Sequence, residues 1–270
     1  MSAGAVRALV GLIALSACGR LDFAARAPAG DATADGLDSA AGDAAGDAAM
    51  ADARASRTAP PAGHVLALPG TGYVSADALC GAMSASAAMT VNAWVLPAAT
   101  QPIGNPEIAA FNTGDGTVNL SLLQWTGSAF NYYDDGASGY QYSGLTIAPG
   151  TWHYASFVVD AAGVGVVYQD GVAQETFTTP RRIPSTGRFS LGQEWDGNTT
   201  SDFFAGHVDE VTVWRVARTQ AEIVDEMNTG PSIGAADLVA YFPFETGVAD
   251  ASGNGYDGTL QATAAIVTTP

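Results

Sequence analysis

The chain has 270 residues and carries 27 Asp and Glu against 10 basic residues, all of them Arg, so its formal net charge is −17. From residue 63 onward, 20 carboxylates oppose five Arg, which leaves a net charge of −15 on the part of the sequence that can fold. Such a surface repels nucleic acid and anionic lipid headgroups and excludes both as partners of a folded face. The charge suits an exported domain or one that binds divalent cations.

Residues 1–18 predict a targeting segment. Arg7 supplies a short positive region, and the apolar run 8–14 is too short to span a bilayer. The run Leu15-Ser16-Ala17-Cys18 resembles the lipobox of bacterial lipoproteins, in which the Cys is acylated and becomes the mature N-terminus. The alternative is an ordinary signal peptide cut after a small residue. Lipidation at Cys18 predicts a palmitate-labelled envelope protein held at the membrane, and Gly19 in place of Asp favours the outer membrane.

Residues 19–62 predict a disordered linker. Ala, Gly, Asp and Ser dominate the segment, and no aromatic residue follows Phe23 within it. Such a composition cannot bury enough apolar surface to offset the entropy lost on ordering. Pro60 and Pro61 end the segment, and residues 63–270 are expected to form a single domain. Cys80 is the only Cys in that domain, which excludes an intradomain disulfide and predicts a buried free thiol.

Short apolar runs separated by Gly- and Asp-rich turns fill the first two thirds of this domain. Asp170-Gly171 between two such runs is a strong hairpin signal. Regular spacing of this kind is typical of an all-β sandwich or barrel. The predicted strands are Val65–Leu68, Met89–Leu96, Glu107–Phe111, Val118–Trp125, Phe130–Tyr133, Trp152–Val159, Val164–Tyr168, Phe177–Thr179 and Arg188–Leu191.

The stretch Phe203–Ile223 predicts a half-buried strand that leads into a short helix. Thr219 followed by Glu222 is a capping box, which opens a helix from about Gln220 to Asn228, and Gly230 ends it. A further strand at Leu238–Phe244 contains Pro243, which places it at an edge or a bulge. We therefore expect an all-β, two-sheet antiparallel jelly-roll sandwich with one short helix late in the chain, whose last strand lies beside the first.

Eight motifs occur in the order found in bacterial laminin-G-like domains, and together they resemble that family of the concanavalin A-like superfamily. The resemblance covers roughly residues 64–260 and implies two antiparallel sheets in a jelly roll. It implies function only loosely, because this fold hosts lectins, adhesion modules, hydrolases and lyases. The motifs are TVNAW, WHYASFVVD, YQDG, LGQE, GHVDEVTVW, RTQAEI, LVAYFPF and DASGNG.

One stretch is similar to the calcium loop of pentraxins, in which G-Q-E-x-D leads to a strand that ends in Trp. Here Gly192–Asp196 reads GQEWD and Trp214 ends the later strand. The resemblance implies that Glu194 and Asp196 are calcium ligands, with Asp202 near a further ligand position. Calcium takes six to eight oxygens, so three acids in one short loop are chemically sensible. The alternative is a solvated acidic loop, since this loop is shorter than that of a pentraxin.

A second candidate cation site is structural. Asp250, Asn254 and Asp209 would converge if the last strand lies beside the strand at Gly206–Trp214. The alternative is that Asp250 and Asn254 form Asx turns.

The stretch FNYYDDGASGYQY is the candidate for sugar binding, because aromatic rings stack on pyranose faces while carboxylates bond the hydroxyls. Its candidate residues, together with one from the acidic loop, are Tyr132, Tyr133, Asp134, Asp135, Tyr140, Tyr142 and Trp195. The alternative is that these Tyr residues pack in strands, where Tyr is common.

Catalysis is the sharpest alternative to binding. Retaining β-glucanases of this superfamily carry E-x-D-x-x-E on one strand. The comparable strand here has His207 and Thr212 at both outer Glu positions, and no Ser-His-Asp motif is visible. The sequence therefore predicts a non-enzymatic, lipid-anchored binding or adhesion module that recognises a carbohydrate or glycoconjugate, with a glycan or an envelope protein as its partner and calcium as its candidate cofactor. A structural envelope lipoprotein without a small ligand, and a glycan-active hydrolase or lyase, are the alternatives.

Overall fold

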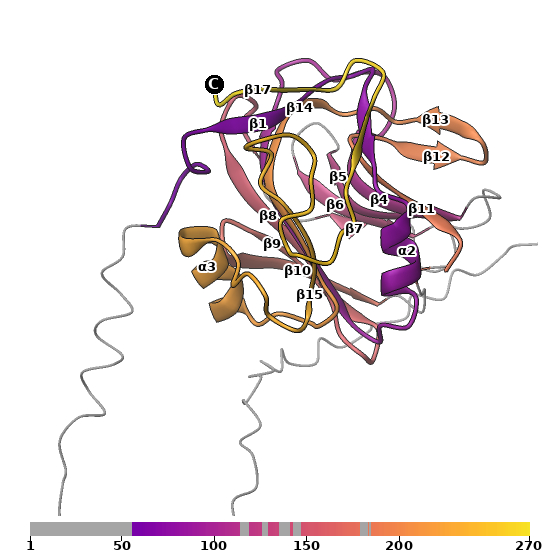
Figure 1. Ribbon diagram of the computed structural model, residues 1–270, viewed down its shortest axis with the longest axis vertical. Helices are drawn as coiled ribbons and strands as arrows, with labels where there is room; N and C mark the ends of the chain where they lie inside the picture. Colours follow the sequence, from indigo (N-terminus) through magenta and orange to yellow (C-terminus); the bar gives the residue numbers. More distant parts are fainter. Residues whose placement is uncertain are drawn as a thin grey trace, which may run out of the picture. The chain divides into compact units, whose positions relative to one another are not determined.

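A computed structural model describes residues 56–113, 119–125, 129–134, 141–142, 147–178, 183 and 185–270. Two antiparallel sheets face each other across one apolar core, which confirms the predicted all-β sandwich (Figure 1). The signal segment, Cys18 and the linker as far as residue 55 lie outside the described residues. Within the described part, no helix is long and apolar enough to cross a bilayer.

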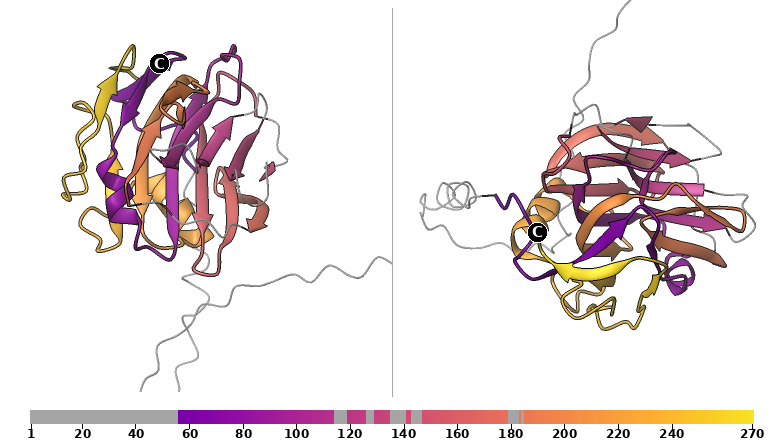
Figure 2. Two further views of the ribbon diagram at one scale, coloured as in Figure 1. Left: turned by 90° about the vertical axis from the view of Figure 1, so that its right-hand side faces the viewer. Right: turned by 90° about the horizontal axis from the view of Figure 1, so that it is seen from above.

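The larger sheet has eight strands and contains the long strand β14 (Ala205–Trp214) near its centre. Its order is β10 (Val172–Thr178), β9 (Val164–Gln169), β8 (His153–Val159), β3 (Met89–Pro97), β14, β1 (His64–Pro69) and β17 (Ala265–Thr268), with β15 (Leu238–Phe242) also on β14. The strand predicted to arrive last, at Leu238–Phe244, corresponds to β15 and pairs with β14, so the expectation that it lies beside the first strand is wrong. The strand beside β1 is β17, which follows β15 and was not predicted (Figure 2).

The smaller sheet has seven strands, and a separate two-stranded hairpin follows its strand β11 in the chain. The order is β16 (Thr259–Gln261), β2 (Tyr73–Ser75), β11 (Gly187–Leu191), β4 (Glu107–Thr113), β5 (Asn119–Trp125), β6 (Phe130–Asp134) and β7 (Gln141–Tyr142). The hairpin consists of β12 (Glu194–Asp196) and β13 (Thr199–Ser201) and projects from the body of the sandwich in Figure 1.

A β-bulge in β14 keeps both halves of this strand facing the core. Val208 and Val211 are both fully buried in the core, although a spacing of three residues would place them on opposite faces of a regular strand. The register shifts between Asp209 and Thr212, where Glu210 has a φ of 51°. The extra residue restores the phase. Trp214 on the outer face is 1% exposed, so both faces of β14 are covered and the strand is more deeply buried than the half-buried strand that its sequence predicts.

Helix α3 (Gln220–Thr229) covers part of the outer face of the larger sheet. The predicted capping box is present, since the N–H of Glu222 donates to the Thr219 hydroxyl and the Glu222 carboxylate accepts from the Thr219 N–H. Ile223 and Met227 pack on Trp94 of β3 and its neighbours. Glu226 is buried beneath the helix, where its carboxylate accepts hydrogen bonds from Asn92, Thr212 and Tyr154.

The expectation of a single helix is wrong, because a second helix, α2 (Ala78–Met83), lies early in the chain. It has only six residues, and its Leu79, Cys80 and Met83 are buried in the core. Cys80 is a free, buried thiol, as expected. Pro243 directly follows β15, which pairs with β14 alone among the described strands, so the expected edge position is confirmed.

Candidate functional site

The hairpin β12–β13 projects from the sandwich, and its strand β12 lies against β4 and β5 of the smaller sheet. Phe189 and Leu191 of β11 point into the core, so Arg188 and Ser190, which alternate with them along the strand, point outward, towards the hairpin. The Ser190 hydroxyl accepts from Nε2 of Gln193 at 2.8 Å and from Nε1 of Trp195 at 3.2 Å. These two bonds fix the base of the hairpin on the sheet.

A layer of polar side chains is buried between the hairpin and this sheet. Nε2 of Gln124 donates to the Glu107 carboxylate, and Oε1 of Gln193 is buried without a hydrogen-bond partner. Buried polar groups are normally paired, so a buried oxygen-rich layer costs folding free energy. The members of this polar layer, all at most 5% exposed, are Glu107, Asn112, Gln124, Ser190, Gln193 and Glu194.

The structure brings two of the three predicted calcium ligands into direct contact. Glu194 and Asp202 lie within hydrogen-bonding reach of each other, and Asp196 is close enough for its charge to act on Glu194. Burial, followed by the charges of Asp202 and Asp196, raises the pKa of Glu194 to about 8. Burial also raises the pKa of Asp202, although its Oδ1 accepts from the Asn105 N–H at 2.9 Å. The raised pKa of Glu194 favours its protonated form, in which its carboxyl donates a hydrogen bond to the Asp202 carboxylate.

The donor set fits a hard divalent cation in part. Oε2 of Glu194 and the amide oxygen of the neighbouring Gln193 are both buried without a hydrogen-bond partner. Oxygen atoms of carboxylates and amides are the ligands of calcium. However, no group of three Asp, Glu, His or Cys side chains among the described residues is arranged to hold a metal ion. Binding would therefore require Asp196, which is exposed on the hairpin, to turn towards Glu194.

Half-buried aromatic rings border the acidic group and form an aromatic patch, defined here as Tyr73, Trp195 and Phe203. Tyr73 of β2 lies edge-on to Trp195 at 6.0 Å between ring centroids, and at 6.4 Å from Phe203. The Arg188 guanidinium lies over the Trp195 ring at 3.9 Å. The three rings thus lie next to one another with the Arg188 guanidinium over one of them, and Trp195 and Phe203 directly follow Glu194 and Asp202 in the chain. The sequence predicted Trp195 as a site residue but not Tyr73 or Phe203; Phe203 lies two residues after β13, whereas Tyr73 reaches the hairpin only through the pairing of β2 with β11.

The sequence-predicted sugar site in the stretch 130–142 is corrected at Tyr132. This side chain is fully buried and stacks between Phe157 and Phe177, with ring centroids at 5.2 and 4.1 Å, so it belongs to the core. Tyr133 and Asp134 lie in β6, and Tyr142 in β7, but their side chains are outside the structural description. Asp135 and Tyr140 lie outside the described residues altogether.

In the second candidate cation site, Asp250 and Asn254 lie in a hydrogen-bonded turn next to β15, which pairs with β14. The Asp250 carboxylate accepts hydrogen bonds from the N–H groups of Tyr241, Ser252 and Tyr256 and from the Ser252 hydroxyl, all at 2.9–3.0 Å. Nδ2 of Asn254 donates to the carbonyl oxygens of Leu238 and Val239. Hydrogen bonds within this turn and to β15 thus account for both side chains, which agrees with the Asx-turn alternative.

Asp209 faces other acids. Its Oδ1 accepts from the Glu210 N–H at 2.9 Å, while Oδ2 is buried without a hydrogen-bond partner. Burial, followed by the charges of Glu210 and Glu245, raises the pKa of Asp209 to about 8. The Glu210 carboxylate accepts from the Tyr241 hydroxyl at 2.6 Å.

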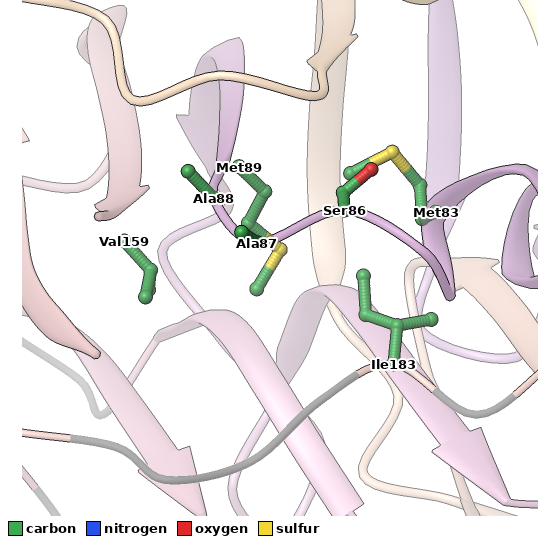
Figure 3. A pocket seen from close by; sticks show the side chains of 7 residues that line it. All are labelled: Met83, Ser86, Ala87, Ala88, Met89, Val159 and Ile183. Carbon is green, nitrogen blue, oxygen red and sulfur yellow. The ribbon is translucent and has the colours of Figure 1, made fainter. Parts of the chain in front are cut away.

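Two cavities in the described part of the molecule offer less than the aromatic patch. One has a volume of about 10 Å³, room for a single water, and Figure 3 shows that the side chains lining it are those of Met, Ala, Val and Ile residues together with the Ser86 hydroxyl. The other is an open groove of about 490 Å³ over the ends of β1, β3 and β14. Its floor includes Ala67, Leu96 and Gly206, and His207 is the titratable group among its lining residues, with a pKa lowered by burial. Neither cavity combines aromatic rings with carboxylates.

A laminin-G-type family model, described as the concanavalin A-like lectin/glucanases superfamily, matches residues 68–224, more than half of the chain. No curated protein sequence matches significantly.

Solved structures with the same fold include a Bacteroides ovatus protein described as a candidate carbohydrate-binding protein (TM-score 0.58, 16% identity), which covers 77% of this chain. The present chain spans 60% of that protein's length. A pentraxin from Limulus polyphemus has a TM-score of 0.55 at 15% identity, covering 77% of this chain and 95% of the pentraxin. A carbohydrate-binding module of a Ruminococcus gnavus sialidase, bound to sialyllactose, has a TM-score of 0.51 at 13% identity, covering 60% and 96% of the two chains.

Proposed function

The chain belongs to the concanavalin A-like lectin/glucanase superfamily, and we propose that it is a carbohydrate-binding module of the bacterial cell envelope. The observation that carries this proposal is the aromatic patch of Tyr73, Trp195 and Phe203 beside the carboxylates of Glu194 and Asp202. Apolar C–H faces of a sugar stack on such rings, and carboxylates accept hydrogen bonds from its hydroxyls. Similar structures include carbohydrate-binding modules, which supports the class of ligand.

The proposal includes a calcium ion at the Glu194–Asp202 pair. Two carboxyl groups that share a proton in a buried position repel each other once that proton leaves. A divalent cation held by Glu194, Asp202 and the exposed Asp196 would relieve this repulsion, and the neighbouring amide oxygen of Gln193 suits the same ion. When bound, the ion supplies a positive charge and open coordination positions for sugar hydroxyls. The protein's own residues hold the hairpin and orient the rings.

Binding without catalysis is the activity that the described geometry favours. At the position of the glucanase motif, Thr212 is fully buried and donates its hydroxyl hydrogen bond to Glu226, so it cannot take the place of a catalytic carboxylate. His153 and Asp170 form a pair, with Nδ1 2.9 Å from Oδ2. The other ring nitrogen, Nε2, is buried without a hydrogen-bond partner, so among the described residues no nucleophile completes a triad there.

The test is a glycan array probed with the purified protein in millimolar calcium and again with a chelator. We expect binding to selected glycans, strongest with calcium, and loss of that binding in Tyr73→Ala and Trp195→Ala. Trp152→Ala is the matched control, because Trp152 is also partly exposed but packs on the α3 cluster. Glu194→Ala combined with Asp196→Ala should abolish the calcium effect. A protein that binds no glycan under either condition would leave the alternative of a structural envelope protein.

Anchoring at the envelope through an acylated Cys18 completes the proposal. The lipobox-like run ending at Cys18 and the Ala- and Gly-rich segment after it suit a lipid anchor followed by a spacer. Three acyl chains give stable membrane attachment, since each buried methylene contributes ~0.8 kcal/mol. The domain would then reach its glycan from the membrane surface.

A further inference from the structure

Arg188 is held in a fixed position beside the aromatic patch. Its guanidinium carbon lies 3.9 Å from the centroid of the Trp195 ring, and Nη2 donates to Oδ1 of Asn198 in the β12–β13 turn at 3.1 Å. Arg188 itself projects from β11, whose neighbours Phe189 and Leu191 are buried in the core. Stacking and one hydrogen bond therefore fix the plane of the guanidinium, and the position of Arg188 in β11 fixes where the side chain leaves the sheet.

The positive charge of Arg188 forms no ion pair within the described part of the chain. Arg218, by contrast, lies 3.7 Å from both Glu222 and Glu226. Asp77 feels the charge of Arg188, yet the Asp77 carboxylate bonds the Phe189 N–H at 3.2 Å and does not pair with the guanidinium. An unpaired arginine is unusual in a domain with a net charge of −15.

The donors that Arg188 leaves unused match a planar anion. A guanidinium has five N–H donors in a rigid fork, and Asn198 takes one of them. A carboxylate offers two oxygens in the same planar spacing and forms the bidentate pair that arginine favours. The surrounding negative charge would repel any anion that lacks this contact, so the contact with the guanidinium determines which anions can bind.

We propose that the aromatic patch selects a sugar residue bearing a carboxylate, such as a uronic acid, over its neutral counterpart, and that Arg188 reads the carboxylate directly. This inference rests on the proposed glycan binding and names the class of sugar that the same site takes. The sugar ring lies against the aromatic patch while its carboxylate meets the exposed edge of the guanidinium. Asn198 is a positioning residue that holds the fork in plane.

Matched oligosaccharides test the inference. The purified full-length protein is titrated calorimetrically with oligogalacturonate, oligoglucuronate and oligomannuronate, and with the carboxyl-reduced, neutral form of each. At least one acidic member should bind more tightly than its reduced partner. Arg188→Gln should weaken that acidic ligand roughly tenfold to a hundredfold, the range of a hydrogen bond to a charged group, and leave the neutral ligand unchanged. Arg215→Gln removes the same charge from an exposed position and should change neither.

The outcomes separate the inference from the function on which it rests. Equal binding of both members of every pair, or an equal loss for both in Arg188→Gln, would overturn the role of Arg188 while glycan binding stands. Acidic binding that survives Arg188→Gln but disappears with a chelator would assign the carboxylate to the cation and overturn the inference. Absence of binding to these probes and to the whole glycan array would defeat the proposed function itself.

Discussion

Burial of the Asp209 carboxyl group should make the folding stability of the domain depend on pH. Asp209 is 1% exposed, and its Oδ2 has no hydrogen-bond partner. Asp209→Asn preserves the Oδ1 acceptor for the Glu210 N–H and removes the titrating group. Because burial and the neighbouring acids raise the pKa of Asp209 from 3.8 to about 8, we expect the wild-type domain to take up a proton at this residue when it folds at neutral pH.

The sign and size of the effect follow from this shift. A raised pKa means that the contribution of Asp209 to stability is complete below about pH 4 and is lost as the pH rises through about 8. Each pH unit in that window changes the free energy of unfolding by up to ~1.4 kcal/mol. At pH 7 the accumulated cost reaches ~4 kcal/mol as an upper bound. The Asn variant avoids that cost and should therefore be more stable than wild type at pH 7.

Urea denaturation followed by tryptophan fluorescence at each half unit from pH 4 to 8 measures this difference. The free energy of unfolding of Asp209→Asn minus that of wild type should be near zero at pH 4 and should rise steadily to pH 8, in the presence of a chelator. Taking the difference cancels the contributions of other titrating groups to first order. Asp237→Asn, at an exposed position, controls for the loss of one charge. Parallel curves for variant and wild type would refute the reasoning, because Asp209 would then be ionised in the folded state.

Two further predictions concern the core and the anchor. Trp214→Ala should destabilise the domain by ~3–5 kcal/mol, because the ring is 1% exposed and lies under the Arg218 guanidinium at 4.1 Å, whereas the half-buried Trp195→Ala should cost much less in the same thermal melt. An unchanged melting temperature for Trp214→Ala would contradict the central place given to β14. Cys18→Ser should abolish palmitate incorporation and release the protein from the membrane fraction or leave it as precursor, and identical fractionation and labelling of both forms would contradict lipidation.

The long strands and the helix α3 were predictable because their signals are local. β3, β8 and β14 carry runs of apolar residues, and the capping box at Thr219 fixes where α3 begins. The elements that were missed are two to six residues long, among them β2, β16 and α2. A three-residue strand such as β2 has no periodicity to detect, and it exists because Leu191 and Leu260 flank Val74 in the sheet.

The candidate site was predictable only where its residues are neighbours in sequence. Glu194, Asp196 and Asp202 were found as a group because one short segment carries all three. Tyr73 could not be assigned to the same site, since it reaches Trp195 through the pairing of β2 with β11. The burial of Tyr132 could have been predicted from the sequence, because side chains two residues apart in a strand point to the same face, and Phe130 and Tyr132 of β6 both face the core.

The arrangement of the hairpin explains why an acidic domain buries carboxyl groups without a paired cation. An apolar layer beneath β12–β13 would be more stable than Glu194 and Gln193 with unpartnered oxygens, so this polar layer reduces the stability of the fold. Native proteins retain such groups where function needs them. Here the same layer fixes Trp195 through its hydrogen bond to Ser190 and brings Glu194 next to Asp202. The residues that reduce the folding stability are therefore the same residues that hold the aromatic patch in place. Binding of a cation and a glycan to the folded state would then raise the free energy of unfolding and offset part of the destabilisation caused by the polar layer.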